Sequence, residues 1–69
     1  MTDSAMLKFK IKKSGLKMTF IADKLGISLN TLSRKTNRKA EFTAREIMNI
    51  SAMLNLTTEE RDQIFFSNG

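Results

Sequence analysis

Between residues 19 and 38, apolar positions recur with the period of an α-helix, and the pattern is broken once in the middle. The first apolar stripe, with a spacing of about 3.6 residues, comprises Phe20, Ile21, Ala22 and Leu25. It stops at Gly26, a residue type that adopts the left-handed conformation needed just past a helix end without steric cost. Ile27 then points inward, Ser28 can cap a new helix, and Leu32 anchors that helix one turn later. The pattern predicts two helices joined by a short turn, the second over about residues 28–36.

The second of these helices carries polar side chains on the face opposite Leu32. At about 100° per residue, Asn30 falls at about 160°, Arg34 at about 200° and Asn37 at about 140° from Leu32. Amides pair well with adenine edges, and guanidinium groups pair with guanine edges, in a DNA major groove. The flanking residues that can reach phosphates are Ser33, Lys35, Arg38 and Lys39.

The order Ile21-Ala22, Leu25-Gly26-Ile27 and Leu32 resembles the helix-turn-helix of the lambda repressor/Cro (XRE-type) family. Nearly the whole chain is similar to the small phage-type Cro-like regulators of that family. The resemblance implies one compact all-α domain of five helices over residues 1–69, with Ala22 at the helix crossing and Gly26 in the turn. The residues that carry the motif are Ile21, Ala22, Leu25, Gly26, Ile27 and Leu32.

The resemblance also implies contacts with DNA. Together with the outward helix face, it gives a base-reading set of Ser28, Leu29, Asn30 and Arg34. The phosphate-contacting set is Lys17, Met18, Thr19, Ser33, Lys35, Asn37, Arg38 and Lys39.

Three positions depart from the family pattern. Leu29 stands where the family often has a polar residue, so it is expected either to touch a thymine methyl or to pack. Lys35 replaces an aliphatic residue, which predicts a less well anchored helix end. Asn37-Arg38 replaces a common Asn-Gly pair, and Asn37 is expected to tolerate the left-handed cap.

The length and the composition of the chain exclude several classes of function. A chain of 69 residues has room for one small core. It contains no cysteine and no histidine, which excludes disulfides, thiolate chemistry and the usual zinc sites. We therefore expect no enzyme, no cofactor and no small-molecule ligand. The apolar runs are too short for a membrane span, and the N-terminus shows no secretory signal, so we expect the cytoplasm. The resemblance implies that the cell is bacterial or phage-infected.

The net charge of +5 is distributed unevenly along the chain. Residues 1–45 contain eleven Lys/Arg against three acidic residues, a net charge of +8. Residues 46–69 contain one basic residue, Arg61, against four acidic residues, a net charge of −3. A solvated surface usually mixes the two signs, so the segregation favours a side that faces a polyanion.

The N-terminal segment is ambiguous between two structures. Residues 7–12 alternate apolar and basic side chains, as an edge strand would. Leu7 and Ile11 also lie one helical turn apart, and Gly15 can end a helix there. Because no second strand pattern is nearby, we favour a helix over about residues 5–14, with Phe9 on a wide buried face. The next helix starts at either Lys17 or Thr19, since no strong cap precedes it.

The C-terminal part predicts two further helices. Thr43 and Glu46 match a capping box, and Thr57 and Glu60 repeat it. Phe42 is expected to fasten the preceding loop to the core, and residues 67–69 are expected to fray. The adjacent rings of Phe65 and Phe66 cannot both be buried by one helix face. They predict a weak homodimer through the last helix, strengthened on DNA, unless the second ring lies over the core edge.

These features predict sequence-specific binding to a double-stranded DNA operator by a Cro-type transcriptional repressor. The helix over about residues 28–36 would lie in the major groove. One alternative is a helical protein-interaction module, antitoxin-like or anti-repressor, whose basic face meets an acidic protein. Another is a surface that binds nucleic acid without sequence preference. The sequence leaves open the operator, the regulated genes and the choice between repression and activation.

Overall fold

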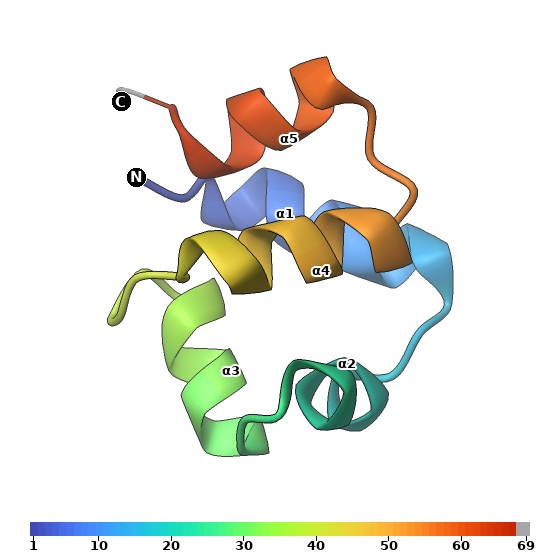
Figure 1. Cartoon of the computed structure of the whole chain (residues 1–69), viewed down its shortest axis with the longest axis vertical. Helices are drawn as coiled ribbons and strands as arrows, with labels where there is room; N and C mark the ends of the chain where they lie inside the picture. The colour runs from blue at the N-terminus through green and yellow to red at the C-terminus, as the bar shows by residue number, and fades with distance from the viewer. Residues whose placement is uncertain (68–69) are drawn as a thin grey trace.

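Helices account for all the regular secondary structure in the computed structural model, which describes residues 1–67 (Figure 1). They are α1 (Ser4–Ser14), α2 (Met18–Leu25), α3 (Leu29–Thr36), α4 (Ala44–Met53) and α5 (Thr58–Phe65). The expected all-α fold with five helices is therefore confirmed for the described residues. Within them, none of the helices has the length and apolar character required to cross a membrane. Of the expected frayed tail 67–69, residues 68–69 lie outside the described part of the chain.

The N-terminal segment is helical, as the lack of a partner strand indicated. Asp3 caps α1, since its carboxylate accepts a hydrogen bond from the Met6 backbone N–H at 3.0 Å. Gly15 ends the helix in the left-handed conformation, with φ 76°. Helix α2 starts at Met18, between the two starting residues that the sequence left open.

The predicted caps of the later helices are all present. The Ser28 hydroxyl accepts a hydrogen bond from the Thr31 backbone N–H at 3.0 Å and begins α3. Both capping boxes are complete, with each threonine hydroxyl and each glutamate carboxylate satisfying a backbone N–H of the other residue. Local sequence chemistry therefore sets where α3, α4 and α5 begin.

A residue in the left-handed conformation follows α2 directly, and another begins the loop after α3. Gly26 has φ 72°, and a Cβ built there would meet no atom within 4 Å. Its glycine therefore serves the backbone conformation, not a close helix approach. After α3 the expectation for Asn37 is wrong, because Asn37 has φ −93° and Arg38 takes the left-handed conformation with φ 65°. The turn is thus completed one residue later.

The helices are arranged in three levels along the longest axis of the molecule. Figure 1 shows α5 at one end, α1 and α4 in the middle, and α2 with α3 at the other end. Packing between helices follows this order, since α2 contacts α3 and α4, α1 contacts α3 and α5, and α4 contacts α5. The two ends of the described chain meet beside α5, where the Asp3 backbone N–H donates to the Ile64 carbonyl.

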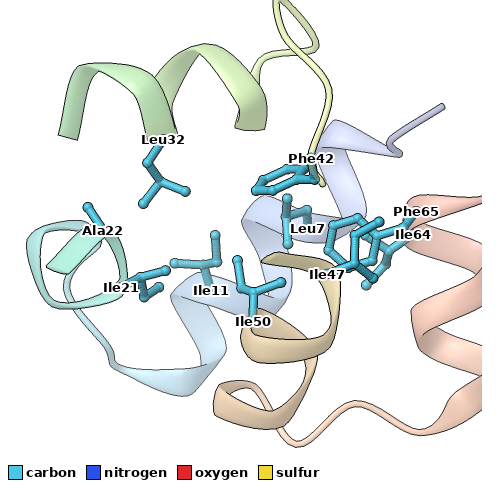
Figure 2. Packing of buried hydrophobic residues seen from close by; sticks show 10 residues of the cluster. All are labelled: Leu7, Ile11, Ile21, Ala22, Leu32, Phe42, Ile47, Ile50, Ile64 and Phe65. Atoms are coloured by element: carbon cyan, nitrogen blue, oxygen red, sulfur yellow. The ribbon is translucent and has the colours of Figure 1, made fainter. Parts of the chain in front are cut away.

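One hydrophobic core joins all the helices (Figure 2). Its buried residues are Leu7, Ile11, Ile21, Ala22, Leu32, Phe42, Ile47, Ile50, Ile64 and Phe65. Phe42 is buried as expected, and its ring meets Phe65 edge-on with centroids 5.4 Å apart. The expected burial of Phe9 is wrong, because Phe9 is 59% exposed and its neighbours on α1, Leu7 and Ile11, fill the core instead. Phe20 of the apolar stripe is also 44% exposed.

Candidate nucleic-acid interface

Helix α3 is fastened by one face and free on the other. Leu32 is completely buried, and Thr36, one turn later, is buried with its hydroxyl donating to the Leu32 carbonyl at 2.8 Å. The Ser4 hydroxyl of α1 donates to the Thr36 carbonyl at 2.7 Å, which holds the carboxyl end of the helix. Asn30 and Arg34 are exposed on the opposite side, as the helical period predicted.

The first turn of α3 presents both apolar and polar groups to solvent. Leu29 is 48% exposed, so its side chain is available for an apolar contact and does not serve the core. The Ser28 hydroxyl is engaged locally, since it also donates to Thr31 Oγ1 at 2.9 Å. Of the predicted base-reading residues, Leu29, Asn30 and Arg34 therefore form the free surface, and Ser28 acts chiefly as the cap.

Hydrogen bonds order the carboxyl end of α3 and the loop that follows. The Arg34 guanidinium donates to the Lys39 carbonyl at 3.3 Å, and this bond uses only part of its donor capacity. The Asn37 amide donates to the Ser33 carbonyl at 2.9 Å. Arg38 and Lys39 are both exposed beside this end of the helix. The loop therefore presents two cations next to the free face of α3.

Lys35 departs from its predicted role. Its ammonium group lies 2.6 Å from Glu46 Oε1, and the two side chains are only 12% and 11% exposed. The same carboxylate oxygen accepts the Thr43 backbone N–H at 2.9 Å, so one atom joins α3 to the start of α4. The Lys35 ammonium is therefore paired within the protein and is not a free cation. The same ion pair anchors the end of α3, so the expectation of a less well anchored helix end is wrong.

The charge of Glu46 is favoured by this arrangement. Burial alone raises the pKa of the Glu46 carboxyl, but the hydrogen bonds from Lys35 and Thr43 outweigh it and hold the pKa below its ordinary value. A second pair links Lys10 of α1 to Glu60 of α5 at 2.5 Å. That hydrogen bond, with one from the Thr57 backbone, likewise lowers the pKa of Glu60.

The start of α2 lies at the same end of the molecule as α3 (Figure 1). Lys17 precedes the helix in extended conformation, and no side chain caps the first turn. Lys17 and Thr19 are exposed, whereas Met18 is half-buried against the core. Backbone N–H groups in a first helical turn carry partial positive charge and suit anions.

The predicted dimer residues separate into a core residue and a surface residue. Phe65 is 4% exposed and belongs to the core, so it is not available to a partner. Phe66 is 57% exposed at the end of α5, as expected for the second of two adjacent rings. Any contact through this end of the helix would therefore involve Phe66.

Sequence reasoning missed the two ion pairs that tie helices together. Glu46 and Glu60 were identified only as capping residues, but each also accepts from a lysine of another helix. A signal was present for Lys35, since it lies three residues after the buried Leu32 and therefore on the same side of α3. No such signal marks Lys10, because its partner lies far along the chain.

No protein-family model, curated protein sequence or solved structure matches this chain.

Proposed function

We propose that this protein binds double-stranded DNA in a sequence-specific manner and regulates transcription. In this proposal α2 and α3 act as a helix-turn-helix, and α3 enters the major groove as the recognition helix. Leu29, Asn30 and Arg34 would contact base edges. Lys17, Met18, Thr19, Arg38 and Lys39 would lie near the sugar-phosphate backbone, with Ser33 and Asn37 beside them.

The observation that carries the proposal is the free face of α3. Asn30 and Arg34 lie one turn apart on that face, and neither contributes to the core. An amide and a guanidinium are the side chains best suited to adenine and guanine edges in the major groove. A helix whose inner face is fixed by Leu32 and Thr36 can present them rigidly.

The surroundings of this face support the same proposal. Exposed cations at Lys17, Arg38 and Lys39 lie on the elements next to α3, where phosphates on both sides of a groove would be met. The acidic residues that follow residue 46, which are Glu59, Glu60 and Asp62, all lie on α5, and Figure 1 shows α5 at the end of the molecule away from α2 and α3. An electrostatic gradient of this sign orients a protein on a polyanion.

A selection experiment tests the proposal. The protein is mixed with a pool of random duplexes at about 0.15 M salt, and bound sequences are recovered over several rounds. We expect a short preferred sequence, bound roughly 10³-fold or more tightly than a scrambled duplex. Binding without enrichment would indicate a non-specific nucleic-acid binder. The absence of binding would favour a protein-interaction module.

A further inference from the structure

The lysines of α1 separate into two groups according to what their side chains meet. Lys10 is paired with Glu60 of α5. The Lys13 ammonium lies 5.9 Å from the centroid of the Phe9 ring, and Lys13 lines a hollow with Glu60 and the end of α4. Lys10 and Lys13 therefore lie on the side of α1 that faces α4 and α5.

Lys8 and Lys12 are placed differently. They line one hollow together with Ile11, Met18, Thr36 and Asn37. Met18 is the first residue of α2, and Asn37 directly follows α3, so this hollow joins α1 to the proposed DNA-binding end. Within residues 1–67 neither lysine takes part in an ion pair, and both are exposed.

The helical period explains the placement. Ser4, Lys8 and Lys12 follow one another at intervals of four residues, so they share one face of α1. Ser4 fixes that face against the carboxyl end of α3 through its hydrogen bond to the Thr36 carbonyl. Neighbours of this kind are separated by about 5–6 Å between Cβ atoms, and each lysine ammonium ends a flexible four-carbon stem. Both ammonium groups can therefore engage the same strand.

We propose that Lys8 and Lys12 form a phosphate clamp on α1 that grips the DNA backbone beside the groove occupied by α3. The inference rests on the proposed function and extends the binding surface to a third helix. Lysine contacts a phosphate as a point charge, without reading sequence. The clamp therefore contributes affinity and orientation equally on every sequence.

The test compares Lys8→Gln and Lys12→Gln with Lys13→Gln in the full chain. Each variant loses one positive charge from the same helix, but Lys13 is on the side away from α2 and α3. The probes are the duplex recovered by selection with the unmodified protein and a scrambled duplex, each titrated at several salt concentrations. Thermal melts establish that the variants are folded, and Lys8→Arg and Lys12→Arg retain the charge.

Each clamp variant should bind both duplexes about five- to tenfold more weakly near 0.1 M salt. The slope of log affinity against log salt should fall by about 0.9 for each lysine lost. Lys13→Gln should change little, because its side chain faces Phe9 and the hollow beside α4 and α5, and the arginine variants should bind as the unmodified protein does. If the unmodified protein binds the selected duplex but Lys8→Gln and Lys12→Gln behave as Lys13→Gln does, the clamp is wrong and the proposed function stands. If selection with the unmodified protein enriches no duplex, the proposed function itself fails.

Discussion

Glu46 shows how a single carboxylate oxygen can hold a helix in place. Oε1 accepts from the Lys35 ammonium of α3 and from the backbone N–H of Thr43, which begins α4. Charge-assisted hydrogen bonds of this kind are shorter and stronger than neutral ones, and burial shields them from water. The carboxyl end of α3 is therefore held by the Lys35–Glu46 ion pair, at a position where an apolar contact would otherwise be expected.

This tie predicts an acid-sensitive contribution to stability. The pKa of Glu46 is lower in the folded than in the unfolded protein, so the contribution is present above the ordinary value of 4.5 and is lost as the pH falls through the folded-state pKa. Glu46→Gln should lower the free energy of unfolding by about 1–3 kcal/mol at neutral pH, because a charge-assisted bond is lost and Lys35 remains half-buried.

Urea unfolding of both proteins between neutral pH and pH 3 checks this prediction. The difference in free energy of unfolding between the unmodified protein and Glu46→Gln should shrink as the pH falls below 4.5. Glu60 is present in both proteins, and so the acid sensitivity that it contributes cancels in the comparison. A difference in free energy of unfolding that stays constant over the whole pH range would show that the bonds of Glu46 do not stabilise the fold as expected.

At the scale of elements, the packing of α3 on the core depends on a small residue and a large one. Ala22 of α2 is 3% exposed and Leu32 of α3 is completely buried, and Figure 2 shows both side chains directed into the space between these helices and α1. A larger side chain at position 22 has no room, and a smaller one at position 32 leaves a void. The sizes of Ala22 and Leu32 therefore determine the position of α3 against α2 and the core.

Two substitutions test this packing. Ala22→Leu should lower the free energy of unfolding by about 1–3 kcal/mol through overpacking. Leu32→Ala should lower it by about 2–5 kcal/mol through a cavity. The matched control is Leu29→Ala on the same helix, which should cost well under 1 kcal/mol because Leu29 is 48% exposed. Equal melting temperatures for Leu32→Ala and Leu29→Ala would contradict the burial assigned to α3.

The elements were far easier to predict from sequence than the surroundings of individual side chains. Caps and glycine stops are local, so Ser28, both capping boxes and Gly26 marked helix boundaries correctly. The exposure of Phe9 and the burial of Lys35 depend on which helix packs against which face. That information is spread over the whole chain and has no local signature. The free face of α3 was predictable because one buried anchor, Leu32, sets the rotation of a regular helix.

At the scale of the whole molecule, the end of α5 carries an exposed aromatic ring. Phe66 is 57% exposed and lines a hollow with Asp3, Met6 and Gln63. Half-sites in operators are spaced by about one helical turn, so the proposed function calls for two protomers side by side on the duplex. We predict a weak homodimer through this end of α5 that is strengthened on DNA.

Phe66→Ser tests the homodimer, and Phe9→Ser is its control because Phe9 is a similarly exposed ring on α1. Sedimentation of the free protein and titration of the selected duplex measure self-association and cooperativity. Phe66→Ser should reduce both, whereas Phe9→Ser should leave both unchanged. Unchanged stoichiometry and cooperativity in Phe66→Ser would remove α5 as the site of pairing.

The proposed function requires that α3 reads bases while its neighbours only hold phosphates. Asn30→Ala and Arg34→Ala should each cost about 1–3 kcal/mol on the selected duplex and relax the preference at one or two base pairs. Arg34→Lys keeps the charge but loses the planar fork, so it should lose preference and retain affinity for a scrambled duplex. Lys39→Ala should weaken binding to both duplexes equally and lower the salt slope by about one.

The most direct measurement is therefore a titration of Asn30→Ala, Arg34→Ala, Arg34→Lys and Lys39→Ala against the selected and scrambled duplexes at two salt concentrations. The account predicts that the ratio of the two affinities falls for the three α3 variants and stays constant for Lys39→Ala. Equal losses on both duplexes for Asn30→Ala and Arg34→Ala would contradict it, since α3 would then contact DNA without reading its sequence.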